Sequence, residues 1–522
     1  MTSAKTRYTE LAKDRDHYVV RARSFAKVTI PSLFPENGTT ASSALYNPYQ
    51  SIGARGVNTL GNKLLITLFP PNTSFAKLDI DDITLDELSR AEGSDKGLRG
   101  EVDKALSKVE RKMLAKLETT PFRPTASEVT KQLLVAGNVC LNMSDMKMPR
   151  YHRLDTYVCK RSPSGKLLEA IIEEKTTLGA LPQSVRDLLP PDMATQALPS
   201  DKPKQGPTSE LDKPVCIYTR IWLDGNMYRR LQYIEGQEIA DTQASWPVSK
   251  LPYFFLRWTK IDNEDYGRAM VEDVYGDLLT CETLMEAITL GTAAMAKLVF
   301  MVNPAATTRG EDIAKANTGD FIEGNAADVT VLQAEKYADF NQARQLVMEI
   351  ERRLSAAFLM NSAVQRAGER VTAEEIRFMA QDLEASLGGV YSVLSQEWQY
   401  PLATLLLAED DMPPLPKDVV APRIVTGVEA LGRVQELSKL DQLVAGVRDL
   451  FGPEVIAKHV NPGEYIKRRA SALGITQEGL ITTDEELTAA DNQQQMANMA
   501  PDMIKAGTAI ATQAMKQDPT NG

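Results

Sequence analysis

The residue types that most often carry out chemistry are present in this sequence, but not at the spacings that chemistry requires. The histidines, His17, His152 and His459, lie in three separate segments, and none forms the HExxH pattern that binds zinc on one helical face. The acidic clusters 79–82 and 409–411 have the oxygen ligands that magnesium prefers, yet they adjoin loop and helix-end signals where solvated carboxylates are common. We expect no metal site, no cofactor and no catalytic group, so the protein is predicted not to be an enzyme.

A glycine-containing stretch from Gly56 to Lys63 falls short of a phosphate-binding loop. That loop requires Lys directly after its second glycine and then Ser or Thr. Here Asn62 follows Gly61, and Leu64 follows the lysine. Leucines at helical spacing continue through the stretch, so it predicts an amphipathic helix and no nucleotide site.

Composition limits the possible ligands and the compartment. The 522 residues are 43% hydrophobic and 25% charged, which is typical of a globular protein of about three domain-sized segments. The net charge of −11, from 59 basic and 70 acidic residues, disfavours a tight grip on phosphates but not a loose passage of DNA. The four cysteines form no CxxC pair, and no apolar run reaches the length of a membrane span or signal peptide. We expect a soluble protein that stays in the reducing cytoplasm.

The first half of the chain changes from helical to strand periodicity near Gly137. Helices are predicted at Tyr8–Ala26, Asn47–Phe69, Val102–Leu117, and from Thr125, with a capping box to Glu128, as far as Gly137. Two hairpins are predicted next, 157–160 with 167–172 and 215–223 with 227–233, separated by a proline-rich loop at 190–207. The aromatic residues of 246–258 favour a partly buried strand over a base-stacking surface.

The second half is organised around two long helices that enclose an insert. A helix is predicted from Tyr266 until Asn303-Pro304 stops it, and Asp339–Met360 is predicted to return and pack against it. The insert between them, Met301–Ala338, has several turn signals. After a loop at 361–370, a capping box of Thr372 and Glu375 predicts another long helix that ends before Pro413.

That long helix is expected to bend at Gly388-Gly389 or at Pro401. Further helices are predicted at Val428–Leu450 and Glu464–Leu473, and a mobile tail follows Ala489.

The run from Asn361 to Tyr400 resembles the portal proteins of T-seven-like short-tailed phages. Other matching stretches are IPSLFP at 30–35, GARG at 53–56, LVAGNV at 134–139, Tyr-Gly-Arg at 266–268 and TGDF at 318–321. The resemblance implies an α+β, mainly helical portal-type fold with wing, stem, clip and crown. It also implies assembly into a dodecameric ring with an axial channel.

The same resemblance implies a division of the chain into parts. These are the first part of the wing with its hairpins (1–265), a stem helix (266–300), the clip (301–338), a second stem helix (339–360), a channel loop (361–371), the long wing helix with a return strand (372–425), the crown (426–490) and a mobile C-terminal tail (491–522).

The implied function is that of a ring at one capsid vertex through which double-stranded DNA is packaged and ejected. The implied partners are about eleven further copies of this chain, the terminase, a tail adaptor, internal core and scaffold proteins and the major capsid protein, with no membrane. The expected location is the virion, preceded by the host cytoplasm during assembly. From the residues alone, a capsid-internal scaffold or adaptor that never meets DNA and a nuclease using the acidic clusters stay open as alternatives.

The candidate DNA contacts are basic residues near the expected channel. Arg366 and Arg370 flank Gly368 in the loop, while Lys297 lies near the end of the first stem helix and Arg344 in the second, with Arg352 and Arg353 as further candidates. For each residue in the stem helices, a salt bridge between subunits is the alternative role. The candidate hinge positions are Gly368, Gly388 and Gly389, because glycine adopts backbone conformations closed to other residues.

Overall fold

The computed structural model describes residues 3–79, 98–186, 214–295, 299–332, 337–360, 381–409, 423–426, 441–452 and 465–466, apart from positions 37, 41, 72–73, 182, 235, 240–241, 305–307, 383–384 and 388. The chain divides into two compact units. The first consists of Met1–Lys77, Glu110–Leu415 and Ile424–Val428, and the second of Leu78–Val109, Pro416–Arg423 and Glu429–Gly522. The first unit contains nearly all of the described elements.

In the second unit the structure describes mainly helical residues. Residues 441–451 are helical, which confirms the C-terminal part of the helix predicted at Val428–Leu450. Helix α4 (Leu98–Glu118) begins in this unit and confirms the helix predicted at Val102–Leu117. Strands β1 (Ala76–Asp79) and β13 (Arg423–Thr426), each with residues in both units, form a two-stranded sheet.

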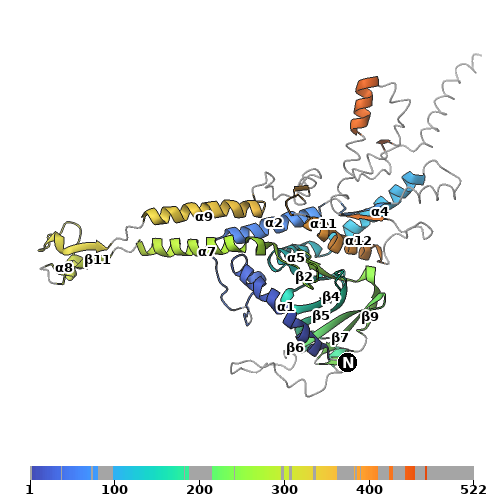
Figure 1. The fold of residues 1–522 in the computed structure, drawn as a ribbon, viewed down its shortest axis with the longest axis horizontal. Coiled ribbons are helices and arrows are strands. Elements are labelled where there is room, and N and C mark those ends of the chain that lie inside the picture. Colours follow the sequence, from blue (N-terminus) through green and yellow to red (C-terminus); the bar gives the residue numbers. More distant parts are fainter. Residues whose placement is uncertain are drawn as a thin grey trace, which may run out of the picture. The chain divides into compact units, whose positions relative to one another are not determined.

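A six-stranded antiparallel sheet is the largest sheet of the first unit (Figure 1). Its strands are β4 (Tyr157–Arg161), β5 (Leu167–Thr177), β6 (Pro214–Asp224), β7 (Met227–Ile234), β8 (Gln237–Glu238) and β9 (Ala244–Pro247). The two predicted hairpins are confirmed as β4–β5 and β6–β7. Pairing of β5 with β6 joins them into one sheet, in the register Glu169 with Trp222 to Thr177 with Pro214.

Helix α1 (Ala4–Lys27) covers one face of this sheet. The core between them is formed by Ala4, Tyr8, Leu11, Val158, Ile171, Cys216 and Tyr218. The sheet residues in this set sit at alternating positions of their strands, as a half-buried strand requires. The predicted helix Tyr8–Ala26 is therefore confirmed, and it starts four residues earlier than expected.

A second core lies around α2 (Ile52–Leu68) and α5 (Phe122–Ala136), which pack together. Beside them is a three-stranded antiparallel sheet of β10 (Tyr253–Arg257), β2 (Asn138–Asn142) and β3 (Arg150–Arg153), in that order. Buried rings of Phe69, Phe122 and Trp398 stack edge-to-face, with centroids of the first two 4.9 Å apart. Such pairs stabilise a core beyond their buried area.

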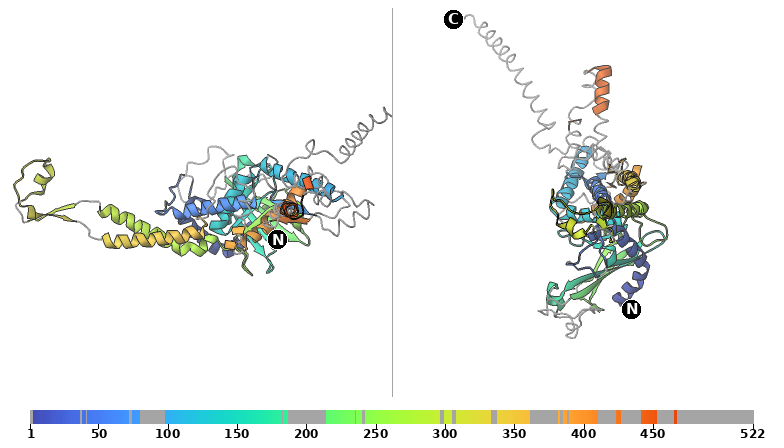
Figure 2. Two further views of the ribbon diagram at one scale, coloured as in Figure 1. Left: turned by 90° about the horizontal axis from the view of Figure 1, so that it is seen from above. Right: turned by 90° about the vertical axis from the view of Figure 1, so that its left-hand side faces the viewer.

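Two long helices, α7 (Met270–Met295) and α9 (Tyr337–Ala357), lie side by side in both views (Figures 1 and 2). The insert between them contains β11 (Val299–Val302), α8 (Gly310–Lys315) and β12 (Val329–Leu332). Strands β11 and β12 are antiparallel, with Val299 opposite Leu332. The short helix α6 (Gln183–Arg186) follows β5 in sequence.

The predicted long helix after residue 372 is interrupted where it is described. Gly389 has a φ of 89°, which ends one helical segment and precedes α11 (Val390–Leu394). A π-helical turn (Ser395–Gln399) connects α11 to α12 (Tyr400–Leu407), and Pro401 lies in the first turn of α12. The expected break at the paired glycines is confirmed at Gly389, while Gly388 and the capping box at Thr372 lie outside the described residues.

Three predicted boundaries are wrong. Helix α5 begins at Phe122, so Thr125 is inside it and no capping box forms. Its hydroxyl instead donates to Pro121 O at 3.0 Å. Helix α2 begins at Ile52 rather than Asn47.

The third error concerns the C-terminal end of the helix predicted from Tyr266 until Asn303-Pro304. Helix α7 spans Met270–Met295, because Val299–Val302 pair with β12 as a strand. A short apolar run of this kind is compatible with either a helix or a strand. Hydrogen bonding to a neighbouring strand then decides which conformation it adopts.

Candidate functional site

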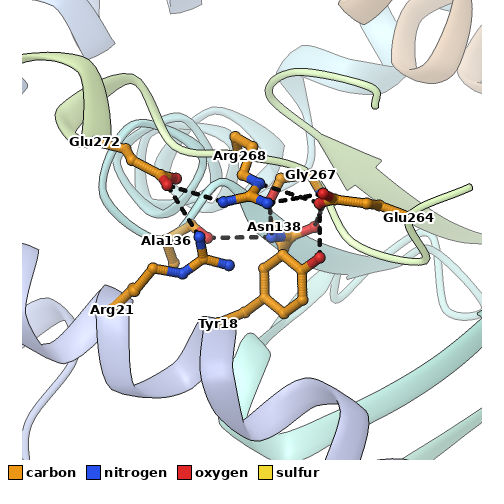
Figure 3. Close-up of polar contacts among 8 residues, drawn as sticks. All are labelled: Tyr18, Arg21, Ala136, Asn138, Glu264, Gly267, Arg268 and Glu272. Atoms are coloured by element: carbon orange, nitrogen blue, oxygen red, sulfur yellow. Dashed lines mark hydrogen bonds and ion pairs between the residues drawn. The ribbon is translucent and has the colours of Figure 1, made fainter. Parts of the chain in front are cut away.

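A charged cluster at the start of helix α7 joins this helix to α1. We call this cluster the α7 anchor (Tyr18, Arg21, Glu264, Arg268 and Glu272; Figure 3). Arg268 lies between two glutamates, with Nη2 2.7 Å from Glu264 Oε1 and Nη1 3.0 Å from Glu272 Oε1. From α1, Tyr18 OH donates to Glu264 Oε2 at 2.6 Å and Arg21 Nη1 donates to Glu272 Oε1 at 3.0 Å. The base of α7 is therefore fixed to α1 by charge-assisted hydrogen bonds, the stronger kind.

The contacts of the α7 anchor shift the pKa values of its members. The hydrogen bond to Glu264 raises the pKa of Arg268, and the same bond lowers the pKa of Glu264. Burial, followed by the hydrogen bond to Glu264, raises the pKa of Tyr18 to about 12. At neutral pH the arginine and glutamate therefore stay charged and the tyrosine stays neutral.

Two backbone segments cross at close range beside the α7 anchor, at Gly137 and Gly267. The Asn138 side chain joins them, since its Nδ2 donates to Gly267 O at 2.8 Å and its Oδ1 accepts from Gly267 N at 2.7 Å (Figure 3). A Cβ on Gly267 would lie 2.8 Å from Thr259 O, and one on Gly137, whose φ is 71°, would lie 2.6 Å from the Arg268 carbonyl carbon. Both positions require glycine.

A second polar contact fixes the middle of α7 to the segment before α2. Glu282 is only 4% exposed, and its carboxylate accepts three hydrogen bonds, from Tyr46 OH at 2.6 Å, Tyr49 N at 2.9 Å and Gln50 N at 3.1 Å. A buried carboxylate requires such partners. The hydrogen bond to Glu282 also raises the pKa of Tyr46 to about 12.

The C-terminal end of α9 is held by α2. The buried Phe358 ring covers Gly56, where a Cβ would come within 2.5 Å of ring atoms. The carbonyl of Leu359, a residue with a φ of 53°, accepts a hydrogen bond from Lys63 Nζ at 2.5 Å. Burial lowers the pKa of Lys63. The lysine of the near-miss phosphate-binding loop thus binds the backbone of the turn that follows α9.

Contacts at both ends show that α7 and α9 are antiparallel. Asp277 near the start of α7 pairs with Arg353 near the end of α9 at 3.1 Å. About four turns further along α7, Gly291 leaves room for the ring of Phe340 at the start of α9. The buried side chains of the two helices include Leu278, Cys281, Val347, Ile350 and Leu354. Leu346, which lies at helical spacing from the buried Ile350 and Leu354, is instead 44% exposed.

The two helices carry different charge. Helix α7 has five carboxylates and no basic residue, whereas α9 has three arginines and three carboxylates. Arg353 is paired with Asp277, and Arg344 and Arg352 are exposed on α9. The pair therefore presents mostly negative charge, with its basic groups on α9 alone.

Within the described part of the chain, no three His, Cys, Asp or Glu side chains gather as a metal site would. Glu409, from one of the two acidic clusters, pairs with Lys116 Nζ at 2.9 Å. His152 is buried, and burial lowers its pKa. Over the same described residues, no helix is both long and apolar enough to cross a membrane.

Comparison with known proteins decides the family. The family model described as bacteriophage head to tail connecting protein matches residues 1–481. This chain belongs to that family. It is similar to the portal protein of Escherichia phage T7, with 39% identity over 99% of this chain and 94% of the relative.

Two further relatives of this connector are also portal proteins. That of Enterobacteria phage T3 is 39% identical over 98% of this chain and 92% of its own length. That of Enterobacteria phage SP6 is 30% identical over 98% of this chain and 96% of its own length. The predicted family membership is confirmed.

Of the candidate DNA-contact and hinge residues, the structure describes Arg344, Arg352, Arg353 and Gly389. Arg344 lies exposed on α9, and Gly389 adopts the left-handed conformation expected of a hinge glycine. The others, Arg366, Gly368, Arg370, Lys297 and Gly388, lie outside the described residues. The DNA-contact and hinge roles of all these residues, described or not, stay predictions.

Sequence reasoning missed the α7 anchor and the Glu282 contact. One signal was present, because Glu264, Arg268 and Glu272 follow each other at intervals of four residues, a spacing at which opposite charges attract along a helix. Their partners Tyr18 and Arg21 lie about 250 residues earlier in the sequence, and no local pattern points to them.

Proposed function

We propose that this connector is a portal subunit, about twelve copies of which form a ring at one capsid vertex. Double-stranded DNA enters through the axial channel during packaging and leaves through it during ejection. The observation that carries the proposal is the 39% identity to two phage portal proteins over 98–99% of this chain. At that coverage the α7–α9 pair, its anchor and the insert all fall within the matched length.

In this proposal the stem comprises residues 266–300 and 339–360, which contain α7 and all but the first two residues of α9. The α7 anchor, the Glu282 contact and the Phe358 contact fix both helices to the rest of the first unit. Apolar side chains on the outer surfaces of the pair stay exposed in the single chain, namely Leu279, Leu290, Leu346 and Met348. Neighbouring copies in a closed ring would cover them.

The charge of the assembly suits DNA that slides rather than binds. A ring of twelve subunits of charge −11 carries about −130 in total, which repels phosphates over most of its surface. The acidic α7 contributes to this repulsion. Local positive belts would then guide DNA, with Arg366 and Arg370 in the 361–371 channel loop, and Lys297 and Arg344 on the stem, as the proposed contacts. A salt bridge between subunits is the competing role of Arg344.

The remaining parts follow the same assignment. The sheets and helices of 1–265 and the segment 372–425 form the wing, 301–338 the clip, 426–490 the crown and 491–522 a tail. The clip is the docking surface for terminase and tail adaptor, while the other parts of the ring contact internal core and scaffold proteins and the major capsid protein. The protein acts without catalysis of its own, in the virion and, during assembly, in the host cytoplasm.

Negative-stain imaging of the purified full-length protein tests the proposal. Rings of uniform size with an axial hole are the expected result, and a predominance of monomers or of closed particles without a hole would contradict it. Incubation with supercoiled plasmid and Mg²⁺ tests the non-enzymatic role. Plasmid nicking by the purified rings would show that an acidic cluster is catalytic after all.

A further inference from the structure

Phe321 is the most exposed large apolar side chain among the described residues. Its relative accessibility is 105%, and the adjacent Ile322 is 41% exposed. Both lie in the insert, between α8 and β12. An exposed aromatic side chain contributes no core packing to its own chain, and aromatic anchors supply much of the energy of protein interfaces. The pair therefore points to a partner.

The turn before Phe321 is held in one conformation. Asn317 N donates to Asp320 Oδ2 at 2.7 Å, and Asp320 N donates back to Asn317 O at 3.1 Å. Gly319 between them has a φ of 103°, which other residues rarely adopt. The chain thus enters Phe321 from a closed, hydrogen-bonded turn.

The segment after Phe321 is held as well. Asn325 N donates to Thr308 Oγ1 at 2.8 Å, and the Thr308 hydroxyl donates to Asp328 Oδ2 at 3.0 Å. Thr308 is buried, and a Cβ on Gly324 would lie 2.6 Å from its hydroxyl oxygen. Because both flanks are fixed, little conformational entropy is lost when a partner covers the phenyl ring.

The charges around Phe321 limit the partner. Between Thr308 and Leu332 the chain has five carboxylates and two basic residues, and Asp320 and Glu323 directly flank the apolar pair. One of the basic residues, Lys315, already pairs with Glu311 at 3.7 Å. DNA phosphates and a second copy of this acidic insert would both be repelled, whereas a surface with lysine or arginine around an apolar pocket would be attracted.

We propose that Phe321, flanked by Asp320 and Glu323, is the docking anchor for the tail-side protein that this connector joins to the head. The partner supplies an apolar pocket for the phenyl ring and basic residues at the pocket rim. This inference rests on the proposed portal function, and it narrows the docking surface of the clip from some forty residues to one side chain and its two neighbours.

The test measures binding of preformed rings of the full-length protein to the purified tail adaptor protein of the same phage. Phe321→Ala is expected to weaken binding at least about tenfold, the size of effect typical of a buried aromatic anchor. Glu323→Gln is expected to slow association and to reduce its dependence on salt. Met148→Ala, which removes another exposed apolar side chain from a loop, is the matched control and should bind like the wild type.

Each outcome separates this inference from the proposed function. If wild-type rings bind the adaptor and Phe321→Ala binds equally well, the anchor is wrong and the portal function stands. If Phe321→Ala abolishes ring formation, the side chain packs against a neighbouring copy, and the inference fails. If wild-type rings do not bind the adaptor at all, the proposed docking function itself is contradicted.

Discussion

Arg268 shows how one side chain in this connector joins three segments. It contacts Glu264 from the β10–α7 connection and Glu272 from the first turn of α7, and these glutamates in turn contact Tyr18 and Arg21 of α1. The arginine and both glutamates are 23–32% exposed. Water therefore screens the cluster in part, and its role is to fix the direction of α7 more than to supply a large stabilisation.

The pH dependence of this cluster follows from Glu264. Its pKa is lowered below the ordinary value of 4.5 by Arg268, so its stabilising contribution is complete above that value and is lost as the pH falls through the lower, folded-state pKa. We expect Glu264→Gln to lower the thermal midpoint at pH 7 and to flatten its decline below about pH 5. Thermal unfolding between pH 7 and pH 3 measures this, and parallel curves for variant and wild type would contradict the assignment.

For single residues, the sequence predicted backbone conformation better than it predicted the contact partners of side chains. Gly137 was predicted to end a helix, and its left-handed φ of 71° confirms this. The close approach of Gly267 to Thr259 and Arg257 was not predictable, since a glycine in a loop does not indicate which backbone passes beside it. From the sequence alone, Glu282 is likewise expected to be an ordinary exposed helical residue. Its three hydrogen-bond donors lie more than 230 residues away in the sequence.

Among the elements, helices with a strong apolar period were predicted well and short apolar runs were not. The helical spacing of apolar residues predicts the ends of α1, α4 and α9 to within a few residues. The run Val299–Val302 was assigned to the end of α7 because it is apolar, whereas pairing with β12 makes it a strand. Thr125 and Glu128 have the spacing of a capping box. The helix nevertheless starts earlier, at Phe122, and buries the side chains of Phe122 and Ala126.

The contact between α2 and α9 gives a prediction about packing. Gly56→Ala places a methyl group against the Phe358 ring and is expected to cost about 1–3 kcal/mol, seen as a lower thermal midpoint. Adding Phe358→Leu should recover part of the loss, because the two changes share one site. Gly276→Ala is the control, since no atom lies near its Cβ position, and it should stabilise α7 by about 0.5–1 kcal/mol. A neutral Gly56→Ala would show that the ring does not cover this position.

Two residues of α9 separate folding from assembly. Ile350 is 1% exposed, so Ile350→Ala is expected to destabilise the chain by about 2–5 kcal/mol. Leu346 is 44% exposed, so Leu346→Ala should leave the stability of the chain nearly unchanged while reducing the yield of rings, in which a neighbouring copy covers it. Thermal unfolding and size-exclusion chromatography measure the two effects. Equal ring yields for Leu346→Ala and the wild type would place this surface in solvent.

At the scale of the whole molecule, the proposed assembly requires contacts that a single chain lacks. Apolar side chains on α7, on α9 and at Phe321 are exposed in the single chain. In the assembly that we propose they would gain partners, and sequence periodicity does not say which copy or protein supplies them. Leu346 is an example, because its spacing matches the buried stripe although its side chain is exposed. The resemblance to portal proteins supplied what the pattern could not, since it extends over nearly the full length of the chain.

The last prediction concerns the charge of the assembled channel. Arg366 and Arg370 lie outside the described residues, and we propose that their copies form positive belts in an acidic ring. Arg366→Glu combined with Arg370→Glu should leave ring formation intact but reduce the length or retention of packaged DNA. The loss should grow with salt, because salt screens the weak contacts that remain.

Lys147→Glu combined with Lys166→Glu is the matched control for this double variant. It makes the same change in net charge at two exposed residues of the first unit, far in sequence from the 361–371 loop. Packaging assays with the purified motor and nuclease protection of the packaged DNA measure both variants. Full-length packaging at wild-type yield by the arginine variant would show that the loop only connects helices. An equal loss in both variants would show that added negative charge reduces DNA retention wherever it lies on the ring, so that no positive belt at the loop is needed to explain it.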